Sequence, residues 1–122
     1  MLMRTKFVIH VPPVTKKNHG QIIMRNGKPI LLPSKQYREY EKAAMIFCPK
    51  HGIDYPVNVG AVFYMKSRRR VDLANLIEAL HDLLVQAGTL ADDNCRIIVS
   101  VDGCRVDYDK EDPRTEVIIE RR

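Results

Sequence analysis

The chain has 122 residues and a mass of 14.1 kDa, which favours one domain over residues 1–122, because each half would be too small for a core of its own. Apolar residues make up 45% and charged residues 29% of it, which is typical of a soluble globular protein and excludes wholesale disorder. No run approaches the ~18 apolar residues of a membrane span, and the first residues lack a signal-peptide pattern. The three cysteines contain no CxxC pair, which argues against a disulfide scaffold or a zinc ribbon. We therefore expect a cytoplasmic protein without membrane attachment.

Charge is distributed unevenly along the chain. Residues 1–50 contain ten basic and two acidic side chains, whereas residues 51–122 contain ten basic and thirteen acidic ones. A basic half attracts a polyanion, for which nucleic acid is the obvious candidate; an asymmetry without any partner is the alternative. No glycine-rich phosphate loop is present, so no nucleotide cofactor is expected.

The first half of the chain predicts a strand, a hairpin and a helix. Residues 5–11 alternate and are rich in β-formers, so they predict a strand that ends at Pro12-Pro13. Asn26-Gly27 lies between two apolar runs and predicts a type I′ turn. Ser34 is a suitable N-cap for a helix near residues 35–48. The buried stripe of that helix is expected to consist of Tyr37, Tyr40, Ala44 and Phe47.

The second half predicts strands around one strongly amphipathic helix. A strand of about ten residues begins at Val57, and leucines at helical spacing predict a helix over 72–87 that Gly88 closes. A strand near 95–101 follows. Asp102-Gly103 is either a turn or a bulge that continues it as one long strand, and we favour the bulge. A final strand covers 115–120. Cys95 and Cys104 are expected to pack in the core. The predicted fold is α+β in two layers, with two helices packed on a mixed, largely antiparallel sheet.

The predicted helix over 72–87 carries polar side chains opposite its leucines. Asn75, Glu78 and Asp82 share this side, while Asp72 lies at its N-terminus as a cap and Asp92-Asp93 lie beyond its C-terminus. One interpretation is a solvated helix face with a polar loop. The other is a carboxylate cluster for Mg²⁺, which needs only one or two protein carboxylates and assists phosphodiester cleavage. Arginines beside such a cluster hold phosphates, and this chain has three of them in a row at Arg68, Arg69 and Arg70.

These residues resemble a known family in their order and spacing. The run from Arg69 to Leu76, then Asp82, Ala87-Gly88 and Asp92-Asp93, resembles the RusA family of Holliday junction resolvases, whose pattern is a basic stretch, D-x-D-N-L, a helix with a further Asp, a Gly and a D-D pair. The segment with Pro12-Pro13 and Asn18 resembles the N-terminal P-P-x-x-N element of that family. The chain departs from the pattern twice: Ala74 replaces the second aspartate, and Glu78 replaces a lysine associated with catalysis.

The resemblance implies a RusA-like, Mg²⁺-dependent endodeoxyribonuclease, in which Mn²⁺ can substitute. Such an enzyme resolves four-way DNA junctions as a homodimer by paired symmetric nicks, in recombination and repair and in a prophage-type setting. The implied catalytic residues are Asp72, Asp93 and Glu78, and the implied metal ligands are Asp72, Asp93, Asp92, Glu78 and Asp82. The residues expected to contact DNA are Lys16, Lys17, Asn18, Arg68, Arg69, Arg70 and Asn75. A DNA-binding protein of the same fold that does not cut, and a nuclease for other branched nucleic acids, remain the alternatives.

Helix length adds a geometric constraint on this site. A sixteen-residue helix is ~24 Å long, so Asp72 at its start and Asp93 beyond its end reach one ion only if the loop folds back along the helix or a partner subunit contributes. We expect some contribution across an intertwined twofold dimer. Since Glu78 lies one turn from Ala74 on the same helix face, its longer side chain is a candidate replacement for the missing aspartate.

Overall fold

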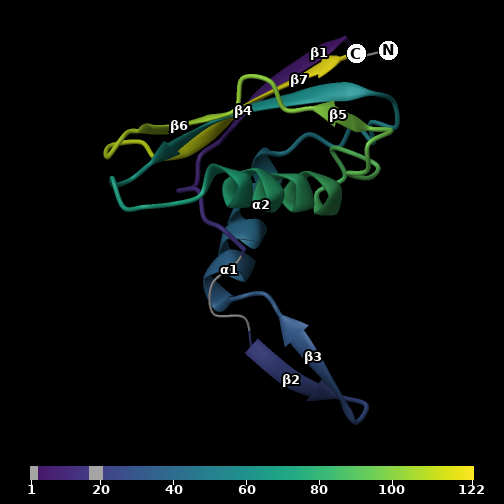
Figure 1. Cartoon of the computed structure of the whole chain (residues 1–122), viewed down its shortest axis with the longest axis vertical. Coiled ribbons are helices and arrows are strands. Elements are labelled where there is room, and N and C mark those ends of the chain that lie inside the picture. Colours follow the sequence, from purple (N-terminus) through teal and green to yellow (C-terminus); the bar gives the residue numbers. More distant parts are fainter. Residues whose placement is uncertain (1–2, 17–20) are drawn as a thin grey trace.

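A mixed sheet with helices on only one of its faces forms the body of the protein (Figure 1). The computed structural model describes residues 3–16 and 21–122. The strand order is β1 (Arg4–Ile9), β7 (Arg114–Arg121), β4 (Val57–Met65) and then an edge that β5 (Ile98–Ser100) and β6 (Arg105–Tyr108) share. The pairs β1–β7 and β7–β4 are antiparallel, whereas β5 and β6 both run parallel to β4. The predicted α+β fold with a mixed, largely antiparallel sheet is confirmed.

The core lies between the sheet and helix α2 (Leu73–Gln86). Alternate residues of β4 and β7 point to the helical side and are buried, as period-two strands require. The leucine arc predicted from the sequence forms the matching surface of α2, with Leu76, Leu80, Leu83 and Leu84 each at most 1% exposed. No helix in the described part of the chain is long and apolar enough to span a bilayer.

The ends of α2 match the predicted signals in part. Ala87 is the C-cap and Gly88 follows it with a φ of 84°, the left-handed conformation that glycine adopts most readily. Asp72 occupies the N-cap position, but its side chain makes no capping hydrogen bond. Its Oδ2 instead accepts a hydrogen bond of 3.2 Å from the Asn75 side chain. The expected cap position of Asp72 is therefore confirmed, but its carboxylate does not cap the helix and stays at the surface.

The N-terminal half contains a hairpin that stands apart from the sheet. Strands β2 (Gln21–Arg25) and β3 (Lys28–Leu32) pair only with each other, and they point away from the body in Figure 1. Asn26 and Gly27 have φ values of 53° and 75°, which confirms the predicted type I′ turn. The hairpin leads into α1 (Lys35–Ala44), at whose start the Ser34 hydroxyl accepts a hydrogen bond from the Tyr37 backbone N–H. The predicted helix ends earlier than residue 48, because a short 3₁₀ helix, η1 (Met45–Phe47), replaces its last turn.

The segment around Asp102-Gly103 differs from the continuous bulged strand that we expected. A turn separates β5 from β6, although both pieces run the same way along the same edge of β4. The buried Asn58 fixes this turn: its Oδ1 accepts hydrogen bonds from the Ser100 hydroxyl (2.6 Å) and the Asp102 N–H (2.7 Å), while its Nδ2 donates to the Asp102 carbonyl (3.1 Å). Asn58 thus replaces the ladder bonds that β4 would make to a continuous strand.

The cysteines occupy three different environments. Cys48 is buried, and burial raises its pKa to about 11. Cys104 is half-buried, and Cys95 lies exposed in the turn before β5. The expectation that Cys95 packs in the core is wrong, because the predicted strand begins only at Ile98.

We expect Asn58→Ala to lower the free energy of unfolding by about 2 to 3 kcal/mol, because it removes three hydrogen bonds worth about 1 kcal/mol each, which hold Ser100 and the Asp102 backbone to β4. Ser100→Ala removes only one of the bonds and should cost about 1 kcal/mol. Urea unfolding followed by circular dichroism measures both. Equal effects of the two substitutions would contradict the role given to Asn58.

Candidate active site

The outward side of α2 carries the polar residues that the sequence places there. Glu78 is exposed, whereas Asn75 and Asp82 are half-buried at its margin. At 1.5 Å per residue, Asp72 and Glu78 are ~9 Å apart along the helix axis, and Glu78 and Asp82 ~6 Å apart. The predicted common face is therefore present, but these acids are spread along the helix.

Lys16 binds the Asp82 carboxylate. Its Nζ lies 2.7 Å from Asp82 Oδ2, and both side chains are partly exposed, at 39% and 29%. The same Nζ lies 5.8 Å from the centre of the Tyr37 ring, whose hydroxyl donates a hydrogen bond of 3.2 Å to the Ala79 carbonyl. Burial and the nearby carboxylates of Glu41 and Asp82 raise the Tyr37 pKa, so its hydroxyl stays protonated and acts as a donor. The contact joins the N-terminal segment, α1 and α2.

Asp92 and Asp93 lie in a loop that returns toward α2. The N–H groups of Thr89 and Leu90 both donate to the Leu84 carbonyl, and the Ala91 N–H donates to the Ile53 carbonyl, which reverses the chain. Further along, Asp92 Oδ1 accepts from the Asp93 N–H (2.8 Å) and Asp92 Oδ2 accepts from the Asn94 side chain (3.1 Å). Asp92 therefore shapes the loop.

His81 lies on α2 next to Asp82 and is partly buried. Burial lowers the pKa of His81 and outweighs the opposite effects of Asp93 and Asp82. Its Nε2 is buried and has no hydrogen-bond partner in the described part of the chain. Asp93 is among the charges that act on His81, which lies five residues before the end of α2. The only sequence signal for His81 is its place beside Asp82.

The acids do not gather into one cluster within a single chain. Among residues 3–16 and 21–122, no group of three or more histidine, cysteine, aspartate or glutamate side chains is close enough together to hold a metal ion. Asp72 lies at the start of α2, whereas Asp93 follows seven residues after its last residue, Gln86. Lys17 and Asn18, predicted to contact DNA, lie outside the described residues.

The arginine run lies exposed between β4 and α2. Arg68, Arg69 and Arg70 are all exposed, and the Arg68 guanidinium lies 4.2 Å from the centre of the Tyr108 ring. The run ends two residues before Asp72, so it brings positive charge to the N-terminal end of α2. Exposed arginines in this position are available to phosphates.

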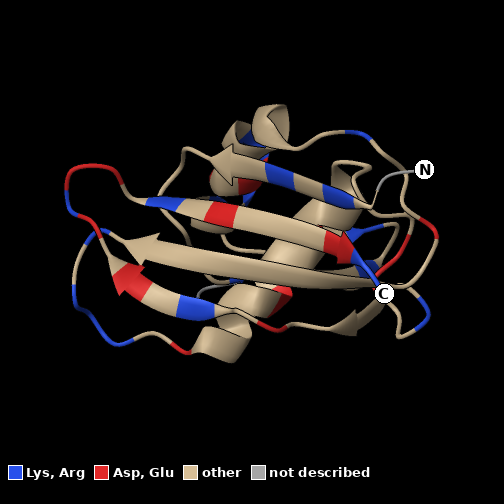
Figure 2. Ribbon diagram, turned by 90° about the horizontal axis from the view of Figure 1, so that it is seen from above, with Lys and Arg blue, Asp and Glu red and all other residues tan. Residues whose placement is uncertain are grey.

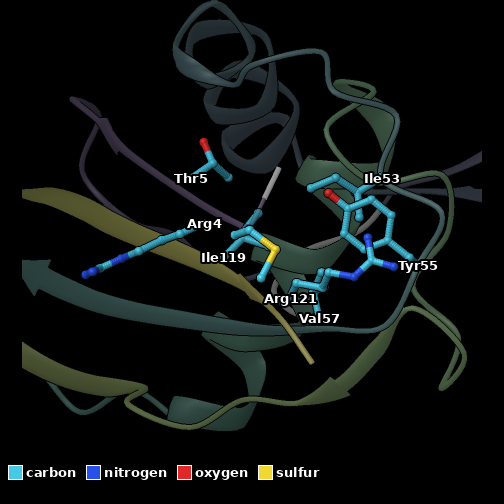
Figure 3. A pocket seen from close by; sticks show the side chains of 8 residues that line it. Arg4, Thr5, Ile53, Tyr55, Val57, Ile119 and Arg121 are labelled. Atoms are coloured by element: carbon cyan, nitrogen blue, oxygen red, sulfur yellow. The ribbon is translucent and has the colours of Figure 1, made fainter. Parts of the chain in front are cut away.

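The pocket in Figure 3 lies at the other end of the sheet and is not a ligand site. Arg121 stacks on Tyr55 there, with 4.2 Å between the guanidinium and the ring centre, and Ile53, Val57 and Ile119 line the floor. These side chains leave no room for even a water molecule.

A basic segment beside exposed carboxylates is an arrangement that enzymes which hydrolyse DNA use. The family described as Endodeoxyribonuclease RusA matches residues 10–120, which is nearly the whole chain. The protein therefore belongs to the RusA endodeoxyribonuclease family, whose members are enzymes that hydrolyse DNA, act on branched junctions and are generally metal-dependent. No curated protein matches the chain. The family identification inferred from the sequence motifs is confirmed.

We expect Lys16 and Asp82 to be energetically coupled. A double-mutant cycle with Lys16→Met and Asp82→Asn should give a coupling free energy of about 0.5 to 1 kcal/mol, because solvent screens this partly exposed pair. The coupling, measured by urea unfolding, should shrink in 1 M salt. Additive effects of the two substitutions at low salt would rule the coupling out.

Proposed function

We propose that this protein is a Mg²⁺-dependent endonuclease that resolves four-way DNA junctions by paired nicks as a homodimer. The proposal rests on the family match over residues 10–120. It also rests on Asp72 and Asp93, which match the first and the last aspartate of the family motif. The turn after α2 supports it, because the hydrogen bonds of Thr89, Leu90 and Ala91 reverse the chain before it reaches Asp93.

The donor chemistry of these residues fits a hard cation. Carboxylate oxygens are the ligands that Mg²⁺ prefers, and it needs only one or two of them because it keeps waters and shares substrate phosphates. The metal ligands that we propose are Asp93 and Glu78, with Asp72 oriented by its hydrogen bond from Asn75. Held by these residues, the ion would act as a Lewis acid on the phosphate that is cleaved. Asp92 and Asp82 have other partners in this structure, since Asp92 shapes the loop and Asp82 binds Lys16.

Lys16 is a candidate for the positive charge that the family lysine supplies at the position of Glu78. Asp82 holds its ammonium group at α2, one helical turn beyond Glu78. An ammonium group there stabilises negative charge that develops on a phosphate during cleavage. Arg68, Arg69 and Arg70 would hold the flanking phosphates, which makes binding depend on salt and little on sequence.

The separation of the acids supports the proposal of a homodimer. α2 has 14 residues and is ~21 Å long, with Asp72 at its start and Asp93 in the loop beyond its end. We infer that each active site combines Asp72 of one subunit with Asp93 of its partner, as a twofold dimer allows.

A synthetic four-way junction incubated with and without Mg²⁺ tests the proposed activity. Paired nicks should form only with the metal, and Asp93→Asn should slow them at least about a hundredfold, since the ligand contributes a few kcal/mol to the transition state. Glu78→Gln should weaken Mg²⁺ binding, whereas Glu111→Gln, in an exposed turn far along the sequence, should not. Binding without products would favour the non-cutting alternative that Ala74 and Glu78 suggest. Cutting of flaps alone would favour a nuclease for other branched substrates.

Mixed subunits test whether the active sites are shared. Asp72→Asn and Asp93→Asn proteins should each be inactive alone, and a heterodimer of the two should regain cutting at one of its two sites. We expect nicks at about half the wild-type number of positions on the junction. A heterodimer as inactive as either parent would show that each subunit holds a complete site.

A further inference from the structure

The hairpin of residues 21–32, called the arm below, carries an unpartnered apolar face. Ile22 pairs directly with Leu31 and Met24 with Pro29, so the four side chains share one side of the ribbon. Ile22, Met24 and Leu31 are 73%, 67% and 71% exposed. A two-stranded ribbon alone is marginally stable in water, and a contiguous exposed apolar patch marks an interaction site.

The charge of the arm complements a polyanion. Arg25 and Lys28 are paired beside the turn, so both positive charges lie at the tip. Residues 1–38 contain eight lysines and arginines and no aspartate or glutamate, and the arm shares this bias. The arm is therefore apolar on one face and carries its two positive charges on the other face, at the tip, so DNA bound at the tip can meet apolar side chains on one side and positive charges on the other.

We propose that the arm is a DNA-binding ribbon that enters the junction at its branch point. Arg25 and Lys28 contact phosphates, while Met24 and Pro29 pack against base faces that the branch leaves open. Two-stranded β-ribbons enter DNA grooves, and methionine, proline, leucine and isoleucine are side chains that wedge between base steps. The inference rests on the proposed function, because it takes branched DNA as the substrate.

The root of the arm ties it to the candidate active site. β3 ends at Leu32, and Ser34 then caps α1, in which Tyr37 donates a hydrogen bond to α2 and underlies Lys16. Strands of five residues give the arm a reach of ~17 Å beyond this root. One DNA molecule can therefore contact the arm and the Lys16 region together, which places the branch point beside the site of cutting.

Charge substitutions at the tip provide the first test. Fluorescence anisotropy in EDTA, over a range of salt concentrations, measures binding to a labelled four-way junction. The comparison is a linear DNA duplex with the base sequence of one branch of that junction. Arg25→Gln/Lys28→Gln should raise the junction Kd about tenfold and lower the salt slope by about two. Lys50→Gln/Lys110→Gln removes the same charge from exposed positions outside the arm and should leave both unchanged. Equal effects of the two double variants would overturn the proposal.

Met24→Ser tests the apolar contact. With 2-aminopurine beside the branch point, wild-type protein should increase the fluorescence, and Met24→Ser should abolish that increase while duplex affinity stays the same. An unchanged increase would refute base contact by the arm. Urea unfolding midpoints equal to wild type show that each variant folds.

Two further measurements distinguish DNA binding by the arm from a subunit contact, and failure of the arm's role from failure of the proposed function. Sedimentation of Ile22→Ser/Leu31→Ser without DNA should match that of the wild type. A change from dimer to monomer would identify the arm as a subunit contact and would overturn the proposal.

If the wild type itself binds the junction no better than the duplex and cuts neither, the proposed function fails. If it prefers and cuts the junction, but the arm variants behave as wild type, only the role of the arm fails.

Discussion

The apolar side of α2 packs against one face of the sheet, and this contact determines where the candidate site residues lie. Because Leu76, Leu80 and Leu83 are buried, the helix cannot rotate, and Glu78 must face solvent while His81 and Asp82 lie at its margins. α2 ends at Gln86, and Gly88 then takes a left-handed conformation, after which hydrogen bonds of Thr89, Leu90 and Ala91 reverse the chain that leads to Asp92 and Asp93. The sheet thus positions the acids although it contributes none of them.

The two departures from the family pattern lie on the same helix face as Asp82. Ala74 removes a carboxylate and Glu78 adds one a turn later, so the number of negative charges on that face is kept while their position moves. Lys16 then brings a positive charge to Asp82, from a segment 66 residues away in sequence. The family pattern has an aspartate at the position of Ala74 and a lysine at the position of Glu78. With Lys16 bound to Asp82, the net charge of this face in the present chain stays close to that of the pattern. This redistribution is consistent with an active site that retains its electrostatics after its ligands have shifted.

Local signals predicted most of the fold, and contacts distant in sequence account for what they missed. Asn26-Gly27, Ser34 and Gly88 each fix a turn or a helix end by their own conformational preferences, and the structure has all three. The break at Asp102 depends on Asn58 in another strand, and no local pattern contains that information. Likewise, the type and spacing of the site acids are visible in the sequence, whereas the Lys16–Asp82 pair and the approach of Asp93 to His81 arise only when the chain packs.

The distribution of charge favours approach of DNA from the side of the helices and the arm. The open face of the sheet carries both signs: Lys6 and Arg105 share one hollow there with Glu116 and Glu120, and Figure 2 shows both red and blue bands on this side of the sheet. Such a surface neither attracts nor holds a polyanion strongly, because its fields cancel within a Debye length. Opposite this face lie Lys16 and the arm, within a stretch that has no acidic residue before Glu39. The acids of α2 lie on the same helical side, so the proposed route of DNA from the basic N-terminal region to the carboxylates does not pass the mixed charges of the sheet.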